Sequence, residues 1–146
     1  MSGNEVFEET RRWLRYAAED LAAAEAALGG TAFAPRHACW LAQQAAEKAI
    51  KAALVFLEVE FPWVHDLDAL RRLLPEDWRA RRDHADLAEL SEWAVEARYP
   101  SSNTPDPTAD DARAAVEQAN AVYGSVVRDL AERGAHVPPT PGPASA

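Results

Sequence analysis

The sequence predicts an all-α protein, a bundle of four long helices with a short fifth helix. Three observations support this fold class. Apolar residues recur about every 3.5 positions over long stretches, which is the period of one face of a helix. Capping residues, prolines and glycines mark the ends of these stretches. The alternation of apolar and polar residues that is typical of strands appears nowhere in the 146 residues.

The first two predicted helices fill the N-terminal part of the chain. Ser2 and Glu5 have the spacing of a capping box, and Gly29 closes the first helix. Pro35 suits the first turn of the second helix, which we expect to reach about Glu58. This second helix is rich in alanine, whose small side chain lets neighbouring helices approach closely. We therefore predict that it is the central helix of the bundle.

The sequence predicts one short and one long helix in the middle of the chain. Asp66 is a candidate N-cap for a short third helix that ends by Pro75. The fourth helix runs through "DLAELSEWAVEARY" and stops before Pro100, because a residue that precedes proline avoids the helical conformation.

Thr108 and Asp111 resemble a second capping box, at the start of the last long helix, which Gly134 ends. The final residues, "VPPTPGPASA", contain nothing that forms a helix or a core. We expect one domain, a helical bundle over residues 1–134, followed by a disordered tail over residues 135–146.

The charge and the single cysteine narrow the classes of function. A formal net charge of −9 argues against broad, non-specific attraction to nucleic acid or to an anionic membrane, although it leaves room for a local basic patch. Cys39 is the only cysteine, so no intrachain disulfide and no cysteine-based metal cluster is expected. The N-terminus lacks the apolar core of a signal peptide, and no run approaches membrane-spanning length. We therefore expect a cytoplasmic protein.

A polar stripe crosses the alanine-rich second helix. Residues four apart lie on one line of a helix, so Gln44 aligns with Lys48 and Gln43 aligns with Glu47. One interpretation is a solvated edge on which Glu47 pairs with Lys51. The other is a cleft in which Gln44 and Lys48 bind a phosphate or the edge of a base. The periodicity favours the first interpretation and does not exclude the second.

The remaining reactive residues give weaker patterns. His65 precedes the third helix, where a local hydrogen bond at a capped helix start is the favoured interpretation. His84 and His136 are not spaced from His65 in the way that the ligands of one metal ion are, so we predict no metal and no cofactor. His37 and Cys39, two apart on a helix, point in opposite directions, which excludes a thiol nucleophile paired with that base.

One basic island stands out in the acidic chain, and it is made of Arg71, Arg72, Arg79, Arg81 and Arg82. It could line a groove that faces RNA. A solvated surface is the favoured interpretation, because nearly all basic residues of this chain are arginines.

Three segments in this order resemble the HEPN family: "RHACWLAQQAAEKAIKAALVFLEVEFP", "HDLDALRRLLP" and "AVEARYP". The opening "WLRYAAEDLAAAEAAL" fits the first helix of that family, so the resemblance covers roughly residues 11–130. It implies an up-and-down helical bundle that dimerises and is often encoded beside a minimal nucleotidyltransferase. Such pairs commonly act as toxin and antitoxin.

Many HEPN proteins are metal-independent RNases whose signature is an arginine followed, after four to six residues, by a histidine. Arg98 of "ARYP" resembles that arginine, but Asn103 stands where the shortest form of the signature has histidine. Asparagine does not act as an acid or base near neutral pH. Arg79 and His84 have the right spacing, yet they precede the helix that carries "ARYP", so we interpret this match as coincidence.

The resemblance gives new weight to the polar stripe. We expect Gln44 and Lys48 to face a cleft that also receives Arg98 and Tyr99, where arginine binds phosphate and tyrosine stacks on a base. A purely structural alternative is an ion pair between Glu47 and Arg98 that ties the second helix to the fourth.

The expected function is a nucleotide- or RNA-binding HEPN module, non-catalytic, that partners a nucleotidyltransferase and itself. The first alternative is a metal-independent toxin endoribonuclease that uses Arg98. The second is a homodimeric interaction scaffold without a ligand. The chain has five tryptophans, Trp13, Trp40, Trp63, Trp78 and Trp93. We expect some of them to anchor a dimer, because aromatic residues are enriched at the cores of interfaces. The alternative is that they cover the ends of the bundle.

Overall fold

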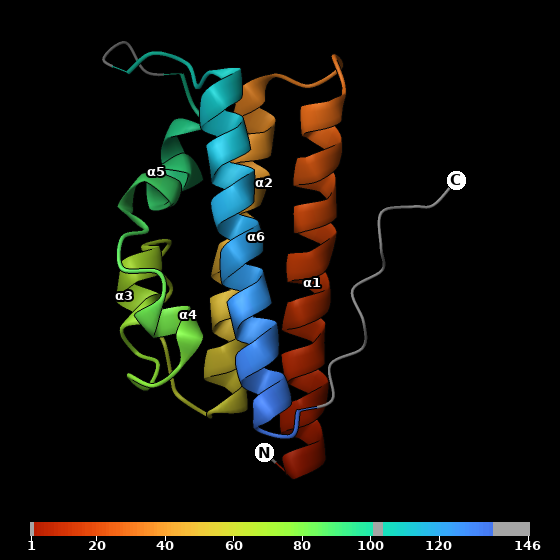
Figure 1. The fold of residues 1–146 in the computed structure, drawn as a ribbon, viewed down its shortest axis with the longest axis vertical. Helices are drawn as coiled ribbons and strands as arrows, with labels where there is room; N and C mark the ends of the chain where they lie inside the picture. Colours follow the sequence, from red (N-terminus) through yellow and green to blue (C-terminus); the bar gives the residue numbers. More distant parts are fainter. Residues whose placement is uncertain (1, 101–103, 136–146) are drawn as a thin grey trace.

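The computed structural model describes residues 2–100 and 104–135, and within these ranges it contains helices and no strand. Three long helices, α1 (Gly3–Gly29), α2 (Pro35–Phe56) and α6 (Ala109–Glu132), run side by side (Figure 1). Helix α2 packs against α1, α6, α5 and α3. The predicted all-α bundle and its central helix are confirmed.

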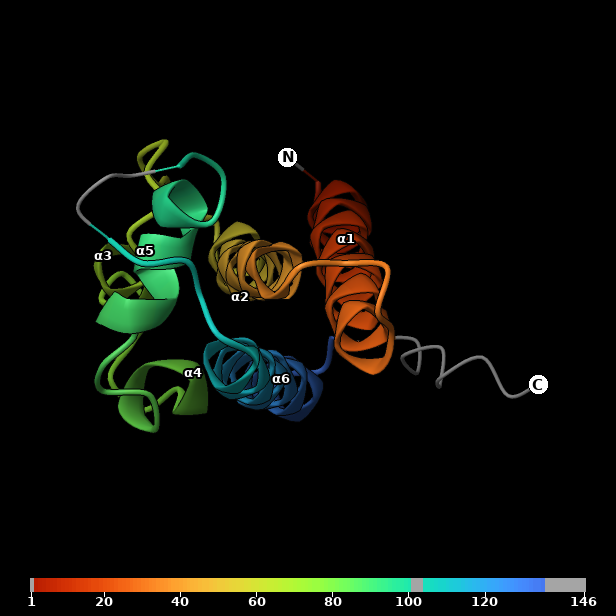
Figure 2. The ribbon, with the colours of Figure 1, turned by 90° about the horizontal axis from the view of Figure 1, so that it is seen from above.

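Three shorter helices, α3 (Leu67–Arg71), α4 (Arg79–Arg82) and α5 (Ala88–Glu96), lie on the side of α2 and α6 away from α1 (Figure 2). The number and length of the helices therefore differ from the prediction. The expected fourth long helix has only nine residues, and the chain leaves the helix at Ala97, three residues before Pro100. Helix α4 was not predicted at all.

The predicted N-terminal caps are confirmed. The hydroxyl of Ser2 accepts the N–H of Glu5 at 3.2 Å, and the Glu5 carboxylate accepts the N–H of Ser2 at 3.3 Å. Thr108 and Asp111 make the same reciprocal pair at the start of α6, at 3.1 and 2.8 Å. The carboxylate of Asp66 accepts two backbone N–H groups at the start of α3. Each cap satisfies donors that a helix leaves open at its first turn.

Helix α6 ends as the sequence predicts. Gly134 has φ +82°, a conformation that suits glycine, and the N–H of Ala135 reaches back to the carbonyl of Leu130 at 2.9 Å. Ala135 is buried, so its side chain packs with the bundle. The rest of the predicted tail, residues 136–146, lies outside the described residues.

The core contains the alanine face of α2 and the facing stripes of α1 and α6. Two tryptophans belong to it, since Trp78 is 2% exposed and Trp93 is 7% exposed, which makes them unsuitable as dimer anchors. Trp63, in contrast, is 86% exposed. Burial also extends to polar side chains of α2, among them Gln43, Glu47 and Lys51.

Candidate functional site

The Glu47 carboxylate is the centre of a buried polar network on α2. One of its oxygens accepts the side-chain amide of Gln43 at 3.0 Å and lies 2.8 Å from Nδ1 of His65. Its other oxygen receives the ammonium of Lys51 at 3.0 Å. Glu47 and Lys51 form the ion pair that one interpretation of the sequence expected, but they form it in the interior rather than on a solvated edge.

This network holds the segment that follows α2. Gln43 also donates to the carbonyl of His65 at 3.2 Å, so His65 is bound to α2 and not locally, as the sequence had suggested. Burial alone would raise the pKa of Glu47, but hydrogen bonds from Gln43, His65 and Lys51 outweigh it and leave that pKa below its ordinary value. The predicted alternative ion pair between Glu47 and Arg98 is not formed. We interpret the network as structural, because its side chains bond to one another and to the carbonyl of His65.

Lys48 and Gln44, two of the predicted site residues, bind other side chains of the protein. The ammonium of Lys48 forms an ion pair with Asp20 of α1, in which both side chains are about one quarter exposed. The amide of Gln44 donates to the side-chain oxygen of Gln43 at 2.7 Å. Lys48 therefore ties α2 to α1.

Ala97, Arg98 and Tyr99, just after α5, line a cavity of about 320 Å³ whose other walls come from the start of α2. Those walls are Arg36, His37 and Trp40, so the cavity differs from the expected one shared with Gln44 and Lys48. The guanidinium of Arg98 lies 5.3 Å from the centre of the Tyr99 ring and 6.0 Å from that of Trp40.

The cavity walls offer hydrogen-bond donors without matching anions. No carboxylate belongs to the described lining residues, and neither Arg36 nor Arg98 has an ion pair within the described ranges. Arg36 donates to the carbonyl of Ala97, at 3.3 Å, and Arg98 donates to the hydroxyl of Tyr99, at 3.3 Å. The buried indole N–H of Trp40 has no acceptor among the described residues. An arrangement of this kind favours an anionic ligand.

His37 adds a proton-exchanging group to the same cavity. Its Nδ1 accepts the backbone N–H of Ala34 at 3.1 Å, which places the proton of the neutral ring on Nε2. In the sequence His37 stands out only beside Cys39, and no local pattern indicates that it lies near Arg98. Asn103, at the expected position of the signature histidine, lies outside the described residues.

Cys39, two residues further along α2, is fully buried. Burial, with smaller contributions from Asp111 and Glu89, raises the pKa of its thiol to about 12. The thiol is therefore protonated at neutral pH, which agrees with the exclusion of a thiol nucleophile.

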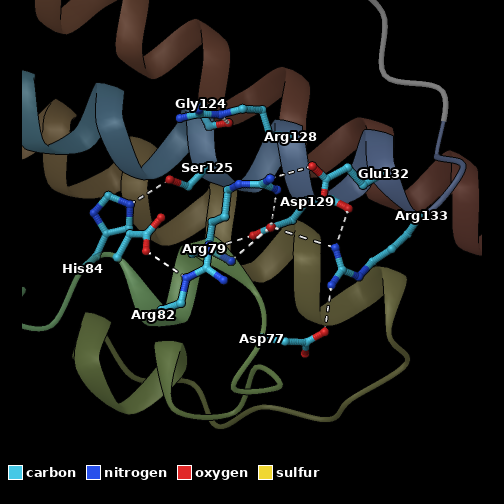
Figure 3. Close-up of polar contacts among 12 residues, drawn as sticks. Asp77, Arg79, Arg82, His84, Gly124, Ser125, Arg128, Asp129, Glu132 and Arg133 are labelled. Atoms are coloured by element: carbon cyan, nitrogen blue, oxygen red, sulfur yellow. Dashed lines mark hydrogen bonds and ion pairs between the residues drawn. The ribbon is translucent and has the colours of Figure 1, made fainter.

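A second polar cluster joins α4 to α6 (Figure 3). Its centre is Asp129, which is 1% exposed. Its carboxylate accepts the backbone N–H groups of Arg79 and Ala80 at 3.0 and 2.9 Å, and thus caps α4 from another helix. The Arg79 guanidinium lies 3.5 Å from Asp129 and 2.6 Å from Glu132. The hydrogen bond from Arg79 lowers the pKa of Glu132, and the same contact raises the pKa of Arg79.

His84 closes the other side of this cluster. Its Nε2 lies 2.8 Å from the hydroxyl of Ser125 on α6 (Figure 3). Burial lowers the pKa of His84 and keeps its ring neutral near pH 7, although Asp83 acts in the opposite direction. The spacing of Arg79 and His84 fits the family signature, but Arg79 is neutralised by two carboxylates. Both residues therefore have contacts within the fold that account for their positions, in keeping with the interpretation of the match as coincidence.

The rest of the basic island is largely engaged as well. Arg71 is buried, where it donates to the carbonyls of Arg81 and Ala85 and pairs with Asp68. Arg81 donates to the carbonyl of Leu74, just after α3. Arg71 and Arg81 thus hold the α3–α4 segment in place, whereas Arg72 and Arg82 are exposed.

Two further structural features bear on function, namely clusters of metal-binding side chains and helices that could span a membrane. The described residues contain no group of three or more histidine, cysteine, aspartate or glutamate side chains placed to hold a metal ion. None of their helices has both the length and the apolar character that a membrane-spanning segment requires.

The architecture is thus that of an all-α bundle with three long helices, and a cavity lined by Arg36 and Arg98 lies between the start of α2 and the end of α5. The HEPN domain family matches residues 10–130, and the chain belongs to this family. It is similar to TT1696 from Thermus thermophilus, with 30% identity and a TM-score of 0.71, over 83% of this chain and 98% of that one. No curated protein matches the sequence.

Proposed function

We propose that the protein is a cytoplasmic, non-catalytic HEPN module that binds a nucleotide or RNA in the cavity between α2 and α5. We further propose that it acts as a homodimer with a minimal nucleotidyltransferase, in a system of the toxin–antitoxin type. One observation carries the binding proposal: Arg36 and Arg98 flank an aromatic cavity without a described carboxylate to neutralise them. Family membership supports the choice of partner.

The chemistry of the cavity suits a phosphate that is attached to a base. A guanidinium presents several N–H groups in one plane and binds phosphate oxygens in pairs. Tyr99, 60% exposed, offers a ring on which a base can stack. The net charge of −9 repels polyanions from most of the surface, so these two arginines would bind the ligand locally.

Gln44 and Lys48 would contribute less to ligand binding than the two arginines. Gln44 lies one turn after Trp40 on α2, so its amide can meet a ligand that extends beyond the cavity. Lys48 lies a further turn along the helix and binds phosphate only if its ion pair with Asp20 opens. We therefore expect Arg36 and Arg98 to contribute more to binding than Lys48.

The test is a titration of single-stranded RNA and of mononucleotides at several salt concentrations. Replacement of either Arg36 or Arg98 by alanine is expected to weaken binding about tenfold, because each removes a charge-assisted hydrogen bond. The slope of log K against log salt should fall by about 0.7 for each arginine removed. Arg128→Ala, on the exposed side of α6, is the matched control and should change neither quantity.

Equal binding by the parent and by both variants would refute the location of the site. Absence of binding by every form of the protein would favour the ligand-free homodimeric scaffold. The proposed partnership has a separate test, which is co-purification of the untagged chain with a nucleotidyltransferase expressed from the same source.

The position of His37 favours a second candidate function, a metal-independent endoribonuclease. Arg98 would stabilise the charged phosphate in the transition state, and His37 would exchange a proton with the attacking or leaving oxygen. Cleavage of single-stranded RNA in the presence of a chelator tests it. Cleavage that is lost in both Arg98→Ala and His37→Gln would select this candidate, and binding without cleavage would retain the non-catalytic module.

A further inference from the structure

A second hollow lies at the opposite end of α2 from the arginine cavity. It has a volume of about 430 Å³ and lies between the first half of α1 and the segment that follows α2. Its described lining includes three aromatic side chains and three carboxylates and no basic residue, and the residues that matter here are Glu9, Trp13, Glu58, Glu60, Phe61 and Trp63. We call this surface the aromatic groove.

The aromatic rings of this groove already bind a cation on their inner side. The ammonium of Lys51 lies 5.8 Å from the centre of the Trp13 ring, 5.5 Å from Phe61 and 5.2 Å from Trp63. Contacts of this length are attractive because the face of an aromatic ring carries negative potential. Trp63 is nevertheless 86% exposed, so most of its surface is free to meet a second group from outside.

Two carboxylates at the rim have no cation partner in the part of the chain that the structure describes. Glu58 and Glu60 form no ion pair within the described residues, whereas Glu9 accepts the indole N–H of Trp13 at 3.2 Å and lies near Arg12. The groove thus combines an exposed indole with unpaired negative charge, which complements a positively charged side chain.

The backbone conformation at Glu58 supports a role in binding for the carboxylates at this rim. Glu58 has φ +56° at the C-terminal end of α2, a conformation that costs a residue with a Cβ about 1 kcal/mol. The hydrogen bonds there, from Glu58 to the carbonyl of Val55 and from Val59 to that of Leu54, form the same kind of helix end that Gly134 forms after α6. Glutamate therefore occupies a position where glycine would be easier to accommodate, and it lines the groove.

We propose that the aromatic groove is a docking site for a basic segment of another protein, one that presents an arginine or lysine between apolar residues. The guanidinium or ammonium lies over Trp63 and pairs with Glu58 and Glu60, while the apolar neighbours cover Trp13 and Phe61. This surface is independent of the nucleotide-binding cavity, because the two sites share no lining residue among those described.

The test uses the full chain, a short capped peptide of alternating arginine and leucine, and the indole N–H signals of the protein in NMR spectra. The peptide is expected to shift the signals of Trp13 and Trp63 and to leave that of the buried Trp78 unchanged. The double substitution Glu58→Gln with Glu60→Gln, and separately Trp63→Ala, should each weaken binding about tenfold, the loss expected for one charge-assisted contact. Glu117→Gln, an exposed glutamate of α6, is the control and should bind as the parent does.

Three results would overturn the proposal. The first is an unchanged Trp63 signal at millimolar peptide. The second is equal binding of a peptide with citrulline in place of arginine, which would indicate an apolar occupant. The third is a shift of the Trp63 signal with protein concentration alone, which would assign the groove to a second copy of the chain. Arg98→Ala should leave peptide binding intact, so failure here is distinguishable from failure of the proposed nucleotide site.

Discussion

Two arginines of this protein, Arg79 and Arg98, have opposite electrostatic surroundings. Arg79 lies between the carboxylates of Asp129 and Glu132, and its own backbone N–H is bound by the first of them. Arg98 lies between two aromatic rings in a cavity without a described carboxylate. The first has its charge neutralised within the fold, and the second has no carboxylate partner among the described residues.

A match in spacing does not by itself make a functional site. Arg79 and His84 have the spacing of the family's RNase signature, but their contacts fix α4 to α6 (Figure 3). Arg98 lacks the histidine at the expected place in sequence, yet the fold brings His37 from another helix into its cavity. The partners of each side chain, rather than its position in a motif, decide what it can do.

The largest expected effect comes from removal of Asp129. Asp129→Ala leaves two N–H groups of α4 without an acceptor and removes one of the two carboxylates that pair with Arg79. We expect a loss of about 3 kcal/mol in the free energy of unfolding, measured in urea. Glu117→Gln, exposed on the same helix, should change it by less than about 0.5 kcal/mol. Equal stability of the two variants would contradict the structural role of the cluster.

The two lysines of the chain give a matched pair of substitutions on one helix. Lys51→Met leaves the buried Glu47 without its cation and is expected to lower the free energy of unfolding by about 2 kcal/mol. The loss is smaller than for a buried charge without any partner, because Gln43 and His65 still bind the Glu47 carboxylate. Lys48→Met removes a partly exposed ion pair with Asp20 and should cost less than about 1 kcal/mol. Urea unfolding of both variants measures the difference, and the reverse order would refute the assignment of the buried network.

The comparison of Arg98 with Arg79 can be tested directly. Arg98→Ala should weaken RNA binding about tenfold and change the free energy of unfolding by less than about 0.5 kcal/mol, because the side chain supports no described ion pair. Arg79→Ala should do the opposite, with a lower urea midpoint and unchanged binding. Should both substitutions affect the same property, the division between a structural and a functional arginine would be wrong.

The smallest effect concerns pH. Because burial lowers the pKa of His84, the unfolded chain takes up a proton at a higher pH than the native protein does. The parent should therefore lose stability as the pH falls below about 6.5, the ordinary value for histidine. His84→Gln keeps a polar group near Ser125 and should lose this part of the pH dependence. Parallel pH profiles for the two proteins would show that His84 does not titrate as inferred.

Local sequence determined the long helices and their ends. Ser2 with Glu5, Thr108 with Asp111, and Gly134 act on backbone groups within a few residues, so their patterns can be interpreted without the rest of the chain. The alanine face of α2 likewise predicted a central helix, because close packing depends on the side chain itself. Arg98 and Tyr99 were identified through a resemblance to the family, and their cavity was only partly predicted.

Tertiary structure decided what depends on residues far apart in the chain. Helix α4 forms under a cap from Asp129, some fifty residues later, which no local pattern could indicate. The polar stripe on α2 is divided in the same way: Glu47 and Lys51 face the interior, Lys48 pairs with Asp20, and Gln44 donates to Gln43. Helical spacing gives the direction of a side chain, whereas burial and charge neutralisation depend on which other helix it faces.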